Sequence, residues 1–188
     1  GGGVVFIPTF NALREAGVMT LDRTQVVAAA FLIQCFGMSM GGLRWAKGLH
    51  DVPPELREAT VHDFWRVIAL VLGCAVPALL VTQWATHFDP HDVLLAFKGF
   101  SLLLGLAVIV TTWTVNRTRP QLAHVHGLDF VALAAIGLVG GFVTALFSVG
   151  VGEFVALYLF IRHYPLTLCA GTAVVVSAIS CLAGAPFH

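Results

Sequence analysis

The stretch SVGVGEF, from Ser148 to Phe154, places a glycine-spaced break and a single carboxylate, Glu153, between two strongly apolar segments. The segment before it, 129–147, is long enough to cross a membrane, whereas only eight apolar residues follow before Arg162. A helix rises about 1.5 Å per residue, so a helix from Glu153 to Arg162 covers only about half of a hydrocarbon core that is roughly 30 Å thick. The sequence therefore predicts a turn near the middle of a membrane.

The longer segment before this turn would overshoot that depth if it crossed the core as a straight helix. We therefore expect the helix over 129–147 to begin outside the core, to be tilted, or to be broken at Gly137 or at Gly140 and Gly141. The sequence leaves these three possibilities open.

The composition of the whole chain indicates a membrane protein. Of its 188 residues, 58% are hydrophobic and only 11% are charged, and the mean hydropathy is +0.90. These values lie outside the range of soluble domains, and the apolar runs do not alternate as the strands of a membrane β-barrel do. The net charge is zero, which provides no basic surface for nucleic acid. The chain is predicted to be an all-α, polytopic transmembrane helical bundle in a lipid bilayer.

Long apolar segments alternate with polar loops along the chain. The predicted spans are 24–45, 63–84, 93–115, 129–147 and 166–187. An apolar start at 1–10 precedes a polar loop at 11–23. The segment 46–62 is charged and holds Pro53 and Pro54, which are expected to stop any helix.

The basic residues of the loops predict the orientation of the chain. Lysine and arginine are concentrated at 46–62 and 116–128, which places these two loops inside the cell. If the chain from Asp129 leaves and returns as a broken hairpin, Arg162 also lies inside, in agreement with the same rule.

The two ends of the chain resemble each other. GGGVVFIP at Gly1 aligns with GVGEFVAL at Gly150, and CFGMSMGG at Cys35 aligns with SAISCLAG at Ser177. With the orientation above, the helices that follow the two glycine turns cross in opposite directions, so the two copies are inverted. Inverted repeats with glycine-broken half-helices are typical of secondary transporters, whose substrate sites lie between the copies. We predict a first repeat core at 1–62, a two-span connecting hairpin at 63–128 and a second, inverted repeat core at 129–188.

These segments, together with GFVTALFSVGVGEF and LCAGTAVVVSAISCLAG, are similar to the paired motifs of the sulfite exporter TauE/SafE family. Those motifs join a glycine triplet, followed by apolar residues and proline, to a later A-V-G-T-S-like helix start. The resemblance covers nearly the whole chain. It implies a carrier in a bacterial-type plasma (inner) membrane for small sulfur-containing or organic anions, such as sulfite, sulfonates or thiosulfate. It also implies that the chain lacks one helix at its start and two at its end.

The chain departs from these motifs at two places. The second triplet reads Gly150-Val151-Gly152, followed by Glu153 where the first copy has Val4. The first copy has Ala29-Ala30 where the second keeps Gly171-Thr172. The resemblance therefore predicts the class of substrate and leaves the individual anion open.

The glycines of the two turns are the predicted anion-binding positions. A turn before a half-helix exposes backbone N–H groups, and the helix start adds a partial positive charge, so an anion can bind there without lysine or arginine. The alternative is that these glycines only allow helices to pack closely. Pairing of the turns across the repeat favours a binding site. Its predicted glycines are Gly1, Gly2, Gly3, Gly150 and Gly152.

Glu153 is predicted to be a proton-coupling residue. An ionisable group near the midplane is costly and is usually retained for a pathway, a proton relay or an ion. Its charged form would repel an anion and is disfavoured by burial, so we expect Glu153 to bind a proton that accompanies or exchanges with the anion. Two alternatives stay open, because Glu153 can instead cap its own half-helix or bind a cation.

Polar side chains on the two helices that follow the glycine turns are predicted to line the substrate path. They are Gln34, Ser39, Thr172, Ser177 and Ser180. The alternative for each serine or threonine is a hydrogen bond to its own backbone or to a neighbouring helix.

A group of loop residues, His87, Asp89, His91 and Asp92, supports a rival function. Imidazoles and carboxylates can ligate a divalent ion, so the alternative is a divalent-metal carrier or a metal-regulated membrane protein. We predict no cofactor, because the four cysteines lack metal-binding spacing. We predict no enzymatic activity, because the sequence has no HExxH or GxSxG motif. No oligomeric state is predicted.

Overall fold

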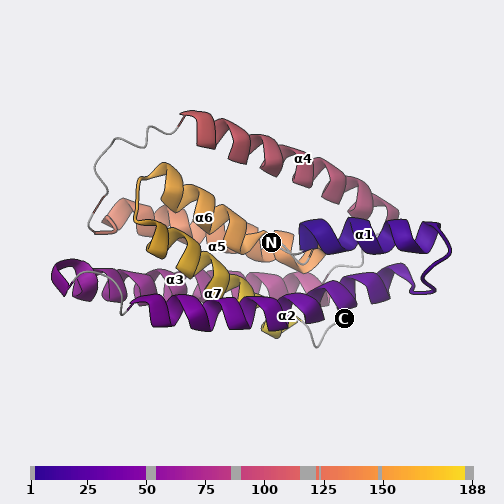
Figure 1. Ribbon diagram of the computed structural model, residues 1–188, viewed down its shortest axis with the longest axis horizontal. Helices are drawn as coiled ribbons and strands as arrows, with labels where there is room; N and C mark the ends of the chain where they lie inside the picture. Colours follow the sequence, from indigo (N-terminus) through magenta and orange to yellow (C-terminus); the bar gives the residue numbers. More distant parts are fainter. Residues whose placement is uncertain are drawn as a thin grey trace.

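The computed structural model describes residues 3–49, 54–85, 90–114, 122, 124–147 and 150–184, and its elements are all α-helices (Figure 1). The predicted all-α class is confirmed for these residues. The helices are α1 (Gly3–Glu15), α2 (Arg23–Gly48), α3 (Pro54–Ala85), α4 (Pro90–Thr114), α5 (Gly127–Phe147), α6 (Val151–Ile161) and α7 (Leu166–Gly184).

Four segments of these helices are long and apolar enough to cross a membrane. They are Thr60–Ala85, Leu95–Thr114, Gly127–Phe147 and Leu166–Gly184, and they correspond to four of the predicted spans. The predicted span at 24–45 lies within α2, which is continuous over 26 residues but is not one of these four. The chain is thus a multi-pass integral membrane protein. By contrast, α6 has 11 residues and, at about 1.5 Å per residue, a length of about 16 Å.

Two helices are longer than the sequence predicts. The first continues to Glu15, so the polar loop before α2 begins only at Ala16. The third already begins at Pro54, inside the segment that the prolines were predicted to keep free of helix. This prediction is wrong because proline suits the first position of a helix, where its missing N–H group has no intrahelical partner in any case.

Of the three possibilities left open for 129–147, a break does not occur, because α5 is continuous from Gly127 to Phe147. Its glycines serve close packing instead. A Cβ atom on Gly137 would lie 2.9 Å from the backbone oxygen of Val71, and one on Gly141 would collide with the backbone oxygen of Ala75. Small residues thus let α5 approach the backbone of α3, as they commonly do between membrane helices.

Contacts along their length show that α3 and α5 run in the same direction. The backbone of Val125, just before α5, bonds to Asp63 in the first part of α3, and Gly141 near the end of α5 faces Ala75. The intervening helix α4 returns along the outside of the bundle (Figure 1). Its exposed side chains include Leu102, Leu106, Ile109 and Trp113, and an apolar outer face suits a helix that contacts lipid.

The main hydrophobic core lies between α3, α5, α6 and α7. Its fully buried side chains include Phe64, Leu133, Val155, Leu159 and Val176. The short helix α6 is therefore held among longer helices, which places its first turn inside the protein.

The other neighbour of α7 is α2, and these two helices run in opposite directions. A Cβ atom on Gly42 would lie 3.3 Å from Val175, whereas Trp45, further along α2, lies near Gly171, which is earlier in α7. The opposite directions predicted for these two helices are thus observed.

Candidate functional site

The glycine-spaced turn between α5 and α6 has a backbone that requires glycine. Gly150 has φ +147°, a conformation that side chains rarely adopt. A Cβ atom there would also lie 2.6 Å from Val143 Cγ1 on α5. The predicted position of the turn is thus confirmed, and tight packing explains why its first position is occupied by glycine.

Two side-chain oxygens accept hydrogen bonds from the backbone at the start of α6. The N–H group of Val151 donates to Thr144 Oγ1 at 3.1 Å, and that of Gly150 donates to Glu153 Oε2 at 3.1 Å. Glu153 therefore makes the capping contact that was one of its alternatives. Thr144 lies on α5 and is buried, with 2% of its surface exposed. Its role could not be predicted, because nothing in the local sequence marks this threonine as the partner of a turn seven residues later.

We expect Thr144→Val to destabilise the protein. Valine keeps the shape of threonine but removes the acceptor, which leaves the buried N–H group of Val151 unpaired at a cost of about 1–2 kcal/mol. Thermal unfolding in detergent should show a lower midpoint. Thr112→Val is the matched control, because the Thr112 hydroxyl donates to the backbone oxygen of Val108 in its own helix at an exposed position, so this variant should shift the midpoint little. Equal shifts in the two variants would show that the cap is unimportant.

The second glycine of the turn brings α6 against α7. A Cβ atom on Gly152 would collide with Ser177 Oγ and would lie 2.6 Å from the backbone oxygen of Ala173. Ser177 is buried, with 9% of its surface exposed. The structure thus brings four predicted site residues together: Gly150, Gly152, Glu153 and Ser177.

The other predicted residues occupy different positions. The hydroxyl of Thr172 donates to the backbone oxygen of Leu168 at 2.6 Å, which is the local bond considered as its alternative. Gln34 is buried and Ser39 half-buried on α2, which packs against α7. Ser180 is fully buried on α7.

Of the glycines predicted to form the first turn, the structure describes one. Gly3 begins α1, whereas Gly1 and Gly2 lie outside the described residues. Phe6, one turn after Gly3, packs in a small cluster that is built around Ala30, Phe97 and Phe147. Because Phe147 ends α5, this cluster brings the start of α1 near the α5–α6 turn.

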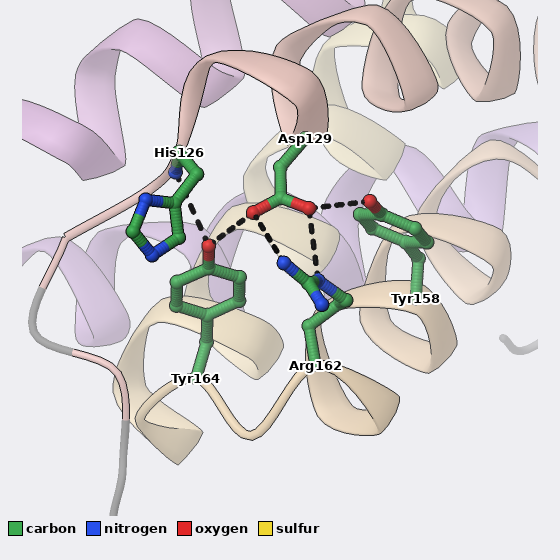
Figure 2. Close-up of polar contacts among 5 residues, drawn as sticks. All are labelled: His126, Asp129, Tyr158, Arg162 and Tyr164. Carbon is green, nitrogen blue, oxygen red and sulfur yellow. Dashed lines mark hydrogen bonds and ion pairs between the residues drawn. The ribbon is translucent and has the colours of Figure 1, made fainter.

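A second polar cluster lies at the other end of α6. Figure 2 shows the carboxylate of Asp129, in the first turn of α5, with three side chains pointing toward it. Tyr158 donates to Asp129 Oδ1 at 2.6 Å, Arg162 Nε donates to the same oxygen at 2.9 Å, and Tyr164 donates to Oδ2. The backbone N–H group of His126 donates to the Tyr164 hydroxyl at 3.3 Å. We call Asp129, Tyr158, Arg162 and Tyr164 the Asp129 cluster.

Tyr164 remains a hydroxyl donor at neutral pH. Burial, reinforced by the hydrogen bond to Asp129, raises the pKa of Tyr164 to about 12. The Asp129 cluster was not predicted, although Tyr158 and Arg162 are four residues apart and hence share one face of α6. That spacing is the signal that the sequence offers for it.

The loop before α5 is bound at the same end of the bundle. Its Leu122 N–H group donates to the backbone oxygen of His163, and its Val125 N–H group donates to Asp63 Oδ2 at 2.9 Å. The segments predicted to lie together inside the cell, around Arg162 and before Asp129, are therefore neighbours.

The rival metal site is not represented in the described part of the chain. His87 and Asp89 lie outside the described residues, and the described residues hold no group of three or more histidine, cysteine, aspartate or glutamate side chains that could bind a metal.

Comparison with protein families matches residues 1–188 to the family described as "Sulfite exporter TauE/SafE". Comparison with curated proteins and with solved structures finds no match.

Proposed function

Because this chain belongs to the sulfite exporter TauE/SafE family of membrane transporters, which are not enzymes, we propose that its substrate is a small sulfur-containing anion such as sulfite, thiosulfate or a sulfonate. The observation that carries the proposal is the buried first turn of α6, which directs the positive end of a helix into the protein. Membership of the family supports a transport function, and this turn supports an anion as the substrate.

The first turn of α6 supports anion binding by its charge and its packing. A helix N-terminus carries a partial positive charge, and its N–H groups favour negatively charged ligands. Gly150 and Gly152 place no side chains of their own in this turn, and Ser177 adds a buried hydroxyl beside Gly152. We therefore place the substrate at Gly150, Gly152 and Ser177.

A second glycine turn would complete the site. The helix that starts at Gly3 packs near the end of α5, and α2 and α7, which follow the two turns, run in opposite directions. Both observations support an inverted repeat with cores at 1–62 and 129–188 and a site between the two turns. On this proposal Gly1, Gly2 and Gly3 bind the anion from the opposite side.

Polar side chains on the two long helices would then line the path. Gln34 and Ser39 on α2 extend the polar lining toward the first repeat, and Thr172 and Ser177 do so on α7. Thr172 contributes least, because its hydroxyl proton is already donated to its own helix.

The contact of Glu153 suggests how proton and anion binding would be coupled. The carboxylate accepts a hydrogen bond from the Gly150 N–H group, which is one of the donors that an anion would use. An ionised Glu153 therefore both repels the anion and competes with it. Protonation removes the charge and weakens the competing bond, so a proton and an anion would enter together. On this proposal, Glu153 caps the helix when it is ionised and carries the coupled proton when it is protonated.

Flux measurements in liposomes test the proposal. We expect uptake of sulfite, thiosulfate or a sulfonate to respond to a pH gradient in the wild type and to lose this response in Glu153→Gln, which is neutral at every pH. Glu15→Gln is the matched control, because Glu15 is an exposed acid at the end of α1 and should leave the response unchanged.

Each other outcome has a definite meaning. If the anion moves and Glu153→Gln keeps its response to the gradient, Glu153 is only a helix cap. If no anion moves and divalent cations do, the substrate class is wrong and the metal carrier replaces it.

A further inference from the structure

The Asp129 cluster joins the end of α6 to the start of α5. These two segments would have to separate if α6 moved. Asp129 lies in the first turn of α5 and Tyr158 in the last turn of α6, Arg162 directly follows α6, and Tyr164 lies in the turn that leads to α7. The cluster thus binds the α6–α7 turn to the start of α5, at the opposite end of α6 from the proposed substrate turn.

The two ends of α6 are both attached to α5. The first attachment is the hydrogen bond from Val151 to Thr144, and the second is the Asp129 cluster. Asp129 and Thr144 are 15 residues apart on α5, or about 22 Å at 1.5 Å per residue, whereas Val151 and Arg162 are separated by only about 16 Å on α6. The long side chains of Tyr158 and Arg162 make up the difference by reaching toward Asp129 (Figure 2).

Within the cluster, the partners of Asp129 differ in their access to water. The Asp129 side chain is 2% exposed, whereas that of Arg162 is 43% exposed. A buried carboxylate is costly to leave unpaired, so the cluster favours the closed arrangement. The guanidinium can nevertheless move into water without loss of hydration, which makes this attachment reversible.

The backbone of the α6–α7 turn is strained in this arrangement. The N–H group of Tyr164 donates to the backbone oxygen of Leu159, and that of His163 donates to that of Phe160, which is the hydrogen-bond pattern of a Schellman helix end. The left-handed position of this motif usually holds glycine, but here it holds His163 with φ +62°. Strain of this kind persists where surrounding contacts maintain it, and it is common at switch regions. The Asp129 cluster supplies such contacts on both sides of His163.

We propose that the Asp129 cluster is a latch that closes the substrate path at this end of the bundle, and that its opening lets the anion pass between α5 and the α6–α7 turn. The latch rests on the proposed transport function, because a gate requires a substrate that passes it. Closed, it holds α6 against α5 as in this structure. Open, it frees the end of α6 while the turn at Gly150 remains attached through Thr144.

A native cysteine reports on the latch. Cys169 is buried, with 1% of its surface exposed, and its thiol donates to the backbone oxygen of Tyr164 at 3.4 Å. Opening of the latch moves Tyr164 away and exposes this thiol. The reporter needs a background in which the other three cysteines, Cys35, Cys74 and Cys181, are replaced by alanine.

The experiment measures the rate at which a membrane-impermeant maleimide labels Cys169 in membrane vesicles of each orientation. We expect Asp129→Asn to label at least about tenfold faster than the parent, because the lost ionic hydrogen bonds shift the opening equilibrium by that order. Tyr158→Phe, which loses one hydroxyl and keeps its ring, should give a smaller increase and is available if Asp129→Asn does not fold. Methanesulfonate, a sulfonate that does not react with maleimide, should change the rate in the parent and not in Asp129→Asn.

Asp63→Asn is the matched control. Asp63 is a buried carboxylate at the same end of the bundle, but it bonds the loop before α5 rather than α6. We expect Cys169 to stay protected in this variant. Equal labelling of the two asparagine variants, or no increase in both Asp129→Asn and Tyr158→Phe, would overturn the latch.

The labelling and transport experiments distinguish failure of the latch proposal from failure of the proposed transport function. Faster labelling of Asp129→Asn, with no effect of methanesulfonate on the parent although liposomes transport it, would overturn the gating role and leave the transport function intact. If liposomes transport none of the three anions, the proposed function fails whatever the labelling shows.

Discussion

Replacing Gly141 with alanine is expected to give the largest loss of stability among simple substitutions in α5. The new Cβ atom would collide with the backbone oxygen of Ala75 and would lie 2.9 Å from the Cα atom of Ala75. These are backbone atoms of α3, so no side chain can rotate away, and α3 and α5 must separate. Overpacking of this kind costs about 1–3 kcal/mol and can cost more where backbones meet. The effect should appear as a lower midpoint of thermal unfolding in detergent.

Gly105→Ala is the control for this prediction. Gly105 is exposed on α4, and a Cβ atom there would meet nothing within 4 Å. Since alanine favours a helix over glycine by roughly 1 kcal/mol, this variant should be as stable as the wild type or more stable. If Gly141→Ala behaves in the same way, α3 and α5 do not pack as closely as the structure shows.

Replacing Gly152 with alanine is expected to have the largest effect on transport. The Cβ atom would enter the position of Ser177 Oγ and would approach the backbone oxygen of Ala173, which pushes the first turn of α6 away from α7. A displacement of about 1 Å at a binding site can reduce its activity by roughly a hundredfold. We therefore expect anion flux in liposomes to fall by about that factor, even in protein that remains folded.

The double variant Gly152→Ala with Ser177→Gly separates packing from chemistry. It removes the collision with the hydroxyl but keeps the close approach to Ala173, so partial recovery of flux is expected if packing alone is important. Ser177→Gly by itself shows whether the hydroxyl contributes to anion binding. Full wild-type flux in Gly152→Ala would remove Gly152 from the substrate site.

The local features of the α5–α6 region could be predicted from the sequence. The length of the apolar run predicts α5, the eight apolar residues before Arg162 predict a short helix, and the glycines predict a turn at Gly150. The grouping of Gly150 and Gly152 with Glu153 follows from adjacency in the chain. Ser177 was predicted as a polar side chain on the helix that follows the turn, and the structure places it beside Gly152.

The long-range partners could not be predicted. Thr144 bonds Val151, and Asp129 bonds Tyr158 and Tyr164, only because α5 and α6 are rotated so that these faces meet. A rotation of either helix about its axis leaves the hydrophobic pattern almost unchanged, since nearly every position is apolar. The sequence therefore contains little information about which polar side chain meets which.

The amino-acid sequence by itself determined that the chain crosses a membrane, where its long apolar spans and the glycine turn at Gly150 lie, and which family it resembles. These properties depend on length, hydropathy and motifs along the chain. The packing of the helices determined that α5 stays unbroken, that Gly137 and Gly141 face backbone, and that Glu153 caps α6. Whether a glycine bends a helix or packs it against another depends on which backbone lies opposite, and that is a property of the assembled helices.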